Sequence, residues 1–460
     1  MLPDKNIEVC ADRVDPKRGI VPMHPEHVSL RRDIWGQMGN RSEIPRQSMT
    51  VGVTRECVPS TMKDSNLSSS RNRILLLSWC LPGMPTGSAV VVEELARRFD
   101  RCEMVVAGED AGFPVPADWS SDLPEIIHVS KTRLRGNSCA GPIRRLIGMP
   151  AFVVRLLRLV DREKIRHLVV VFPSGYYLFA AWIVKNLRTV SLYPYLHNTF
   201  AENRKGWRLL LGNWLTKRLF KASSQVFVMS RGLVEFYEAS YPGLRVSALP
   251  HAFSGEFPHM DQVRESESIL RLGIHGSVNE GNADAVKRLL DAFSGDSDLE
   301  IVMYSPTSAD ELDRLGVSRS GMAHMSPADR MDVLRGLSTC DVVLLPHGLS
   351  GGFSDVEYAT IFPTRTIDLL RCGRPILAHC PESSFLARFL TEHACAEVVT
   401  QADVEALRSA LGRLLSDKAM VATLVANAQQ TAHEFRGDRV AGILRAATGV
   451  GEFGSPPIVI

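Results

Sequence analysis

The sequence predicts an α/β protein with two Rossmann-like, doubly wound parallel-sheet domains. From residue 73 to about residue 430, short apolar runs alternate with helical patterns, as is typical of parallel strands joined by crossover helices. A polar, turn-rich stretch at 251–268 interrupts this alternation, which is the composition of a domain linker. The length of 460 residues also favours two or three domains, because a single core rarely organises so long a chain.

Composition excludes several classes of protein. The 53 Lys and Arg residues nearly balance the 51 Asp and Glu residues, so coating nucleic acid is not the expected task and no nucleic-acid partner is expected. Hydrophobic residues at 45% and charged residues at 23% exclude collagen-like, largely disordered and disulfide-scaffold proteins. Nine scattered cysteines without a C-x-x-C pair predict reduced thiols, and the charged N-terminal residues do not resemble a secretory signal. We therefore expect a cytoplasmic protein.

The expected organisation has five parts. They are a disordered N-terminal extension (1–72), a first Rossmann-like domain (73–250), a linker (251–268), a second Rossmann-like domain (269–436) and a C-terminal helix and tail (437–460).

Each domain is expected to contain its own set of strands. In the first domain the apolar runs predict strands at 74–78, 103–108, 125–130, 167–171, 191–196 and 225–230, with a helix at 88–99. In the second they predict strands at 269–276, 299–304, 341–346, 375–379 and 396–400, and helices from Asn282 and at 327–338, 364–372, 403–415 and 417–435. The most apolar stretch, 168–184, is interrupted by Pro173 and Gly175, so a strand, a turn and a helix start are expected there in place of a membrane span.

Ligands of parallel sheets bind beyond the carboxyl ends of the strands, so the loops there are the candidate site. Gly87 precedes a predicted helix, where backbone N–H groups can approach an anion or a sugar, although a plain tight turn would also need glycine. His197 and Asn198 follow the strand at 191–196 and could donate to sugar hydroxyls or phosphate oxygens, unless His197 is purely structural. Gly276 and Ser277 form a similar strand-to-helix corner, which suits an anion.

The segment 359–380 is the most informative. Phe362 and Pro363 break the backbone before a predicted helix that Thr364 could cap, and Arg365 and Asp368 are three residues apart on one helical face. The corner could offer N–H groups and a guanidinium to a diphosphate while the carboxylate accepts from ribose hydroxyls. The alternative is a capped helix with an ion pair between Arg365 and Asp368.

Together these segments, over about 74–435, resemble the retaining glycosyltransferases of family 4 (glycosyl transferases group 1), which have the two-domain GT-B fold. The resemblance is carried, in order, by ILLLSWCLPGMPTGSAVVVEELARRF, VFVMSRGLVEFY followed by LPHAF, GSVNEGNADAVKRLL, and CDVVLLP with FPTRTIDLLRCGRPILA. The last segment is the most specific, because it resembles the donor-binding segment of the family.

The resemblance implies roles for individual residues. His197 would contact the transferred sugar, Gly87 would line the cleft, and Gly276 and Ser277 would lie near the diphosphate. Asp368 would take the place of the ribose-binding second Glu of the family's E-x7-E motif. The resemblance also implies retention of configuration, assisted by the diphosphate leaving group, with no cofactor and no metal.

Two departures from the family pattern are visible. Thr360 stands at the first Glu position of the E-x7-E motif, and Glu357 is nearby but out of register. A basic pair frequent in the family is absent from GSVNEGN, so Arg365 is the expected source of positive charge.

Asp296-Ser-Asp298 has the spacing of a metal-binding D-x-D motif, but it precedes the strand at 299–304, so we expect a solvated turn there.

Two basic stretches suggest a membrane partner. Residues 142–167 carry seven Lys and Arg, and residues 204–221 carry six with two Trp and no acidic residue. Such helices either lie on anionic lipid or pack as ordinary surface helices.

We expect a transferase that moves a hexose from a nucleotide sugar to a glycan or lipid-linked acceptor in surface or exopolysaccharide synthesis, at the inner face of the cytoplasmic membrane. The alternatives are a nucleotide-sugar epimerase and a non-catalytic membrane scaffold of the same fold.

Overall fold

The computed structural model describes residues 72–84, 86–130, 141–172, 174–257, 269–318, 320–326 and 330–451. These residues belong to one compact unit, Ser68–Ile460. The predicted disordered extension lies outside the described residues up to position 71, as do positions 258–268 of the predicted linker.

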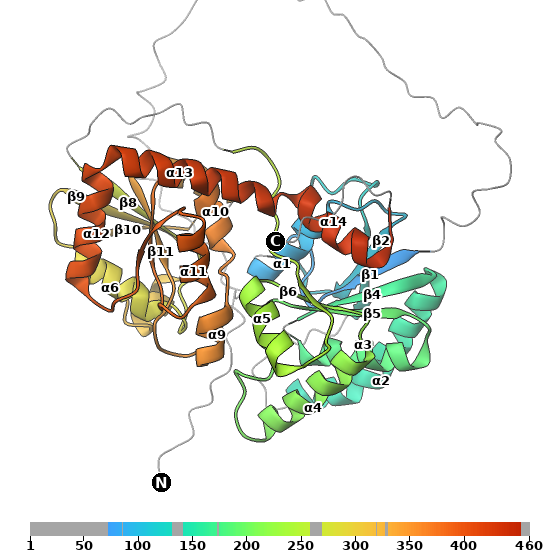
Figure 1. Ribbon diagram of the computed structural model, residues 1–460. Coiled ribbons are helices and arrows are strands. Elements are labelled where there is room, and N and C mark those ends of the chain that lie inside the picture. Colours follow the sequence, from blue (N-terminus) through green and yellow to red (C-terminus); the bar gives the residue numbers. More distant parts are fainter. Residues whose placement is uncertain are drawn as a thin grey trace, which may run out of the picture. The chain divides into compact units, whose positions relative to one another are not determined.

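The first domain is built on a seven-stranded sheet in which every neighbouring pair of strands is parallel (Figure 1). The strand order is β3-β2-β1-β4-β5-β6-β7. The strands are β1 (Arg73–Leu77), β2 (Met104–Glu109), β3 (Glu125–Ser130), β4 (Ile165–Val171), β5 (Ser191–Leu196), β6 (Val226–Val228) and β7 (Val246–Ala248).

In the described part of the first domain, five helices connect these strands. They are α1 (Gly87–Ala96), α2 (Gly141–Arg162), α3 (Gly175–Leu187), α4 (Trp207–Ala222) and α5 (Arg231–Ser240). The expectation for 168–184 is confirmed, because β4 ends at Val171 and α3 begins at Gly175. Within the described ranges, no helix combines the length and the apolar character that crossing a bilayer requires.

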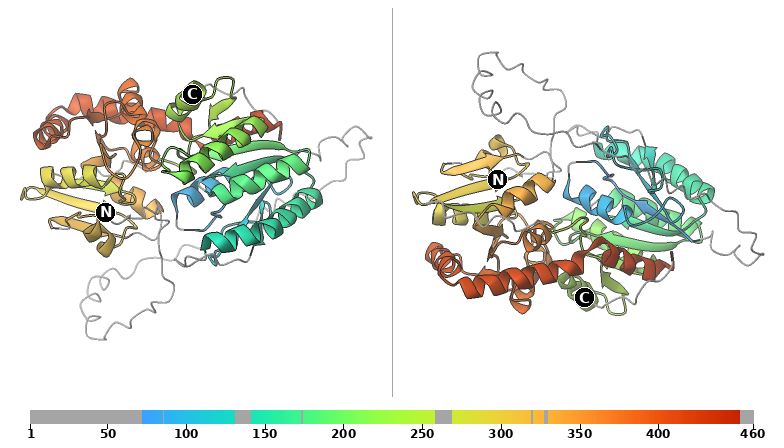
Figure 2. Two further views of the ribbon diagram at one scale, coloured as in Figure 1. Left: turned by 90° about the horizontal axis from the view of Figure 1, so that it is seen from below. Right: turned by 90° about the horizontal axis from the view of Figure 1, so that it is seen from above.

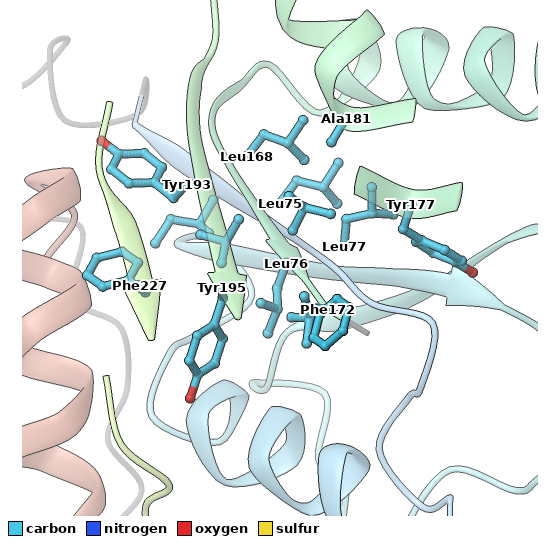
Figure 3. Packing of buried hydrophobic residues seen from close by; sticks show 14 of the residues in the cluster. Leu75, Leu76, Leu77, Leu168, Phe172, Tyr177, Ala181, Tyr193, Tyr195 and Phe227 are labelled. Atoms are coloured by element: carbon cyan, nitrogen blue, oxygen red, sulfur yellow. The ribbon is translucent and has the colours of Figure 1, made fainter. Parts of the chain in front are cut away.

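The core of the first domain forms around β1, an interior strand of the sheet that lies between β2 and β4. Leu75, Leu76 and Leu77 have no exposed surface, and Figure 3 shows them among side chains from β4, β5 and α3. A central parallel strand is covered on both faces, which explains why its sequence, RILLL, is an apolar run without alternation. Burying each such leucine stabilises the fold by about 1.5–3 kcal/mol.

The second domain contains a six-stranded parallel sheet in the order β10-β9-β8-β11-β12-β13. Its strands are β8 (Leu270–His275), β9 (Leu299–Tyr304), β10 (Met322–Met325), β11 (Val342–Pro346), β12 (Ile376–His379) and β13 (Glu397–Val399). Helices flank each sheet on both faces (Figures 1 and 2).

The helices of the second domain are mostly short. They are α6 (Ala283–Phe293), α7 (Ala309–Arg314), α8 (Arg330–Ser338), α9 (Asp355–Thr360), α10 (Arg365–Arg371), α11 (Phe385–Glu392), α12 (Val404–Ser416) and α13 (Lys418–Ala432), followed by the 3-10 turn η3 (His433–Phe435). The predicted class, an α/β protein with two doubly wound parallel-sheet domains, is confirmed. Predicted and observed strand bounds differ by no more than two residues, but β7 and β10 were missed.

The last helix, α14 (Gly437–Thr448), packs on the first domain although it follows the second in sequence. Val440, Ala441 and Leu444 belong to the buried core of the first domain, and α14 lies beside α1 in Figure 1. The Tyr193 hydroxyl of β5 also donates to the Ala447 carbonyl at 3.1 Å. The first domain is therefore completed by the C-terminal end of the described chain.

Candidate functional site

The candidate site lies at the carboxyl ends of the parallel strands. His197 directly follows β5, Gly276 directly follows β8, and Gly87 opens α1 after β1. A separate surface depression, lined in part by Arg271 and Ser297, lies where β8 and β9 begin. That depression is at the wrong end of the sheet for a ligand of this architecture.

His197 is buried and held by the start of α1. Its Nδ1 lies 3.1 Å from the Ser88 hydroxyl oxygen, and its ring packs edge-on against Tyr195. Burial lowers the pKa of His197 to about 3, so the imidazole is neutral at neutral pH. Its Nε2 is buried and has no hydrogen-bond partner among the described atoms, which leaves this nitrogen to exchange a hydrogen bond with a ligand hydroxyl.

Gly87 brings the first domain close to the predicted donor corner of the second. A Cβ added at Gly87 would lie 3.9 Å from the Thr364 hydroxyl oxygen. Thr86 caps α1 by accepting from the Ala89 N–H at 3.2 Å. The prediction that Thr364 caps α10 is wrong, because Thr364 has a helical backbone conformation and its side chain makes no cap hydrogen bond.

Gly276 and Ser277 form a turn that Arg365 holds in place. Gly276 has φ +98°, which favours glycine, and an added Cβ would lie 3.3 Å from the Arg365 guanidinium carbon. Arg365 donates to the carbonyl oxygens of His275 at 3.2 Å and of Ser277 at 3.0 Å. Burial lowers the pKa of Arg365 to about 10, so it keeps its positive charge. Its predicted contact with a diphosphate stays a prediction.

Asp368 is buried, with 4% of its surface exposed. Arg330 donates to its carboxylate from Nε at 3.0 Å and from Nη2 at 2.6 Å, and His275 Nε2 lies 3.3 Å away. Burial by itself raises the pKa of Asp368, but Arg330 and His275 outweigh burial and hold it well below its usual value. The carboxylate is therefore ionised. The alternative ion pair with Arg365 is not supported, since Arg330 takes that place.

The other predicted site residues lie next to His197 or just before α10. Asn198 follows His197 and is partly buried, as is Pro363. The Phe362 ring is buried and packs against Phe389 and stacks on Phe435. Its side chain therefore stabilises the second domain, and a contact with a donor would have to come from its backbone.

Sequence reasoning missed several residues that the fold brings to the site. Arg330 Nη1 lies 3.3 Å from Glu94 Oε1 on α1, and its Nη2 lies 3.1 Å from His251 Nε2. Burial, with Arg330 nearby, lowers the pKa of His251 to about 3. Ser88 could have been found from the sequence, because it places a hydroxyl directly after Gly87. The contact between Glu94 and Arg330 could not, because 236 positions separate the two residues.

Thr360 and Glu357 have different surroundings. The Thr360 hydroxyl donates to the Val356 carbonyl at 2.7 Å, and the Thr360 carbonyl accepts from the Ser230 hydroxyl at 2.6 Å, so Thr360 has structural partners. Glu357 is buried, and one carboxylate oxygen accepts from the Thr199 N–H at 3.0 Å and from the Thr199 hydroxyl. Burial raises the pKa of Glu357. This contact ties α9 to the segment that follows His197.

The possible metal motif is a surface turn, as expected. Asp296, Ser297 and Asp298 are exposed, and Asp296 Oδ1 accepts from the Asp298 N–H at 3.0 Å just before β9. In the part of the chain that the structure describes, no three His, Cys, Asp or Glu side chains are grouped as metal ligands.

No protein-family model and no curated protein matches the sequence. The structure is similar to sucrose-phosphate synthase from Thermosynechococcus elongatus, with a TM-score of 0.61 at 13% identity over 82% of this chain and 98% of that chain. HepE from Anabaena in complex with UDP-glucose has a TM-score of 0.57 at 14% identity over 81% of this chain and 99% of the other. The UDP-forming α,α-trehalose-phosphate synthase from Burkholderia xenovorans, in complex with glucose-6-phosphate, has a TM-score of 0.57 at 12% identity, covering 82% and 100% of the two chains. These similarities show that the chain has the GT-B fold.

Proposed function

We propose that this protein is a glycosyltransferase that moves a hexose from a nucleotide sugar to a glycan or lipid-linked acceptor. One observation carries the proposal: the fold places an ionised, buried Asp368 and a glycine turn at Gly276 at the carboxyl edge of one sheet, and a neutral His197 at that edge of the other. A carboxylate suits ribose hydroxyls, a glycine turn suits a diphosphate, and a neutral imidazole suits a sugar. HepE, a structural neighbour, was solved with UDP-glucose, which favours the same donor class.

The residue roles follow from this placement. Asp368 accepts from the ribose hydroxyls, and the turn at Gly276 and Ser277 presents its backbone to the diphosphate. His197 and Asn198 contact the transferred sugar, with Gly87 beside them. Thr364, Pro363 and the backbone of Phe362 border the donor, and Arg365 orders the turn from behind.

The proposed reaction retains the configuration of the sugar and needs no metal. The diphosphate leaving group would receive the acceptor's proton as the acceptor attacks from the same face. Support comes from the family 4 resemblance of the donor segment. The anomeric configuration of the first product, measured by NMR, tests retention, and activity that EDTA abolishes and a divalent cation restores would contradict the metal-independent reaction.

Exposed apolar side chains on α2 and α4 support a membrane-borne acceptor. Both helices pack against α3, and they expose Leu146, Ile147, Trp207, Leu210 and Leu211. The α4 sequence contains no acidic residue, and its Lys and Arg side chains include the exposed Arg208, which lies over the Trp207 ring. Apolar and aromatic side chains flanked by cations suit an anionic lipid surface, such as the inner face of the cytoplasmic membrane.

Co-sedimentation with lipid vesicles tests this part of the proposal. The protein should sediment with phosphatidylglycerol vesicles at physiological salt and less with phosphatidylcholine vesicles, and the double variant Trp207→Ser/Leu210→Ser should lose most of this binding. Leu187→Ser is the matched control, because Leu187 is also an exposed apolar residue of the first domain but lies at the end of α3. Equal binding by the double variant would exclude α4 as the contact.

A thermal-shift screen with UDP, GDP, ADP and CMP and their sugar conjugates tests the transferase proposal first. A ligand that binds only the folded protein raises the unfolding midpoint by mass action. We expect one nucleotide family to raise it, with or without EDTA. No shift with any nucleotide would reject the proposed donor site.

A second candidate, a non-catalytic scaffold, rests on Thr360, which stands where the family's E-x7-E motif has its first Glu. The hydroxyl and carbonyl of Thr360 make only structural hydrogen bonds among the described residues. Nucleotide binding without turnover on any acceptor would favour it. An epimerase would need an acid and a base around the sugar, and the pKa of His197 at about 3 makes it a poor acid or base at neutral pH.

A further inference from the structure

Arg330 lies at the centre of a charged cluster that joins the two domains at the candidate site. It is the first residue of α8, and its guanidinium donates to the Asp368 carboxylate from two nitrogens, at 3.0 and 2.6 Å. Its Nη1 is 3.3 Å from Glu94 in the first domain, and its Nη2 is 3.1 Å from His251. The guanidinium therefore stands between the predicted ribose contact and α1.

Arg330 differs from the two other arginines near Asp368 in what holds it. Arg365 donates to two backbone carbonyls beside Gly276. Arg371 is buried, lies 4.0 Å above the Phe253 ring and donates to the backbone carbonyl at position 256 at 2.9 Å. Releasing either would leave backbone carbonyls without their donor. The partners of Arg330 are side chains, which a ligand can replace without disturbing a loop.

The charges of the cluster favour such a replacement. Asp368 and Glu94 carry two negative charges around the guanidinium of Arg330, and Arg371 Nη1 lies 3.9 Å from Asp368 but is held by a backbone carbonyl. Of the two guanidinium groups at Asp368, Arg330 is therefore the one that can turn toward a diphosphate and offset its repulsion by the carboxylates. Burial lowers the pKa of Arg330, but Asp368 and Glu94 outweigh burial and raise it, so the guanidinium remains charged. Both oxygens of the Asp368 carboxylate accept from Arg330. A ribose hydroxyl that donates to Asp368 therefore competes with Arg330 for one of them.

We propose that Arg330 is the anion-binding residue of the donor site: it exchanges the Asp368 carboxylate for the diphosphate of the nucleotide sugar as the ribose takes over Asp368. The inference rests on the proposed donor site. The planar, two-pronged N–H geometry that now meets a carboxylate meets a phosphate equally well. Because Arg330 also contacts Glu94, the exchange changes a link between the two domains as the donor binds.

The test compares a nucleoside diphosphate with its own nucleoside. Calorimetry with UDP, GDP and ADP first selects the diphosphate that wild type binds. Arg330→Gln should then weaken its affinity by about 10- to 100-fold, the worth of a charge-assisted contact. The affinity for the nucleoside should stay the same or improve, because Asp368 is released for the ribose. Arg335→Gln is the matched control, since Arg335 is an exposed arginine on the same helix that pairs with Asp332, and it should bind as wild type does.

Circular dichroism and thermal unfolding establish that each variant is folded. If Arg330→Gln does not fold, Arg330→Lys carries the same comparison, because lysine keeps the charge and loses the two-pronged geometry. The ratio of diphosphate to nucleoside affinity should still fall in that variant.

The outcomes separate the two proposals. A folded Arg330 variant with the wild-type ratio of affinities overturns the inference and leaves the donor site standing. Equal losses for diphosphate and nucleoside also overturn it, because they assign Arg330 a structural role or a contact with the nucleoside. Wild type that binds none of the nucleotides overturns the proposed function itself.

Discussion

At the scale of single residues, the site depends on side chains whose ionisation state is fixed by their surroundings. His197 is kept neutral by burial, while Asp368 is kept ionised by Arg330 despite burial. His197 was singled out from the sequence because it follows a predicted strand, and Asp368 because it shares a predicted helix face with Arg365 in the segment that resembles a donor-binding segment. Their partners Ser88 and Arg330 were not, because hydrogen bonds between distant segments leave no local pattern.

Replacing His197 is expected to affect turnover more than stability. In the proposed function, His197→Ala removes the hydrogen-bonding group that contacts the sugar, so kcat should fall by about 10²- to 10³-fold, as when a preorganised donor is lost. Ser88→Ala should lower kcat about fivefold with little change in KM, because it removes one hydrogen bond that orients the ring. Steady-state kinetics and urea unfolding measure both effects; equal losses of activity and stability in His197→Ala would mean that the ring is only structural.

Replacing Asp368 should weaken nucleoside and nucleotide alike. In the proposed function, the Asp368 carboxylate accepts from the ribose, which nucleoside and nucleotide share. Asp368→Asn removes the charge of that acceptor, so both affinities should fall by about tenfold or more. Calorimetry measures them, with the exposed Asp291 changed to Asn as control. Unchanged affinities would reject the ribose contact.

At the scale of elements, long apolar strands were predictable and short ones were not. The strands at 191–196 and 299–304 were placed without error, because they are apolar runs that the sheets mostly bury. The edge strand at 125–130 was also placed without error, although only its last two residues are buried. β7 (VSA) and β10 (MAHM) have only three and four residues. Strands this short do not show an alternation of apolar and polar residues that could be recognised in the sequence. They are strands because a neighbouring strand supplies their hydrogen bonds.

The helix α14 should act as part of the first domain. Leu444 is fully buried in that core, so Leu444→Ala should lower the free energy of unfolding by about 2–5 kcal/mol. The tryptophans that the structure describes, at positions 79, 119, 182, 207 and 214, all lie in the first domain, so their fluorescence in urea reports its unfolding.

The control for α14 is Leu415→Ala on α12. Leu415 is 39% exposed and lies in the second domain, so this change should leave the tryptophan transition in place. If Leu444→Ala behaves in the same way, α14 does not complete the first domain.

At the scale of the whole molecule, stability should fall in mild acid. The pKa values of His197 and His251 are about 3 in the folded chain against about 6.5 in an unfolded one. Between those values the unfolded chain binds more protons, so the free energy of unfolding decreases as pH falls below about 6.5, by up to about 1.4 kcal/mol per pH unit for each histidine. Asp368 acts in the same direction only below about pH 3.9, where the unfolded carboxylate titrates. The raised pKa of Glu357 acts oppositely, stabilising the fold as this carboxylate protonates.

Urea unfolding between pH 7.5 and 5 measures the effect. His251→Gln should show a shallower loss of stability with falling pH, whatever its absolute stability. The exposed His128 offers the control His128→Gln, which should follow the wild-type slope. Parallel slopes for wild type and His251→Gln would mean that His251 does not resist protonation in the folded protein.

The sequence by itself determined the two-domain parallel-sheet class, most strand positions and the loops at the carboxyl ends of the strands, because burial periodicity and strand ends are local properties of a chain. It also located His197, Gly276 and Asp368. Only the tertiary structure decided what these residues touch: Ser88 beside His197, Arg365 folded over Gly276, Arg330 between Asp368 and Glu94, and α14 returned to the first domain. Those contacts join segments far apart in sequence, and their geometry and burial arise only when the sheets have packed.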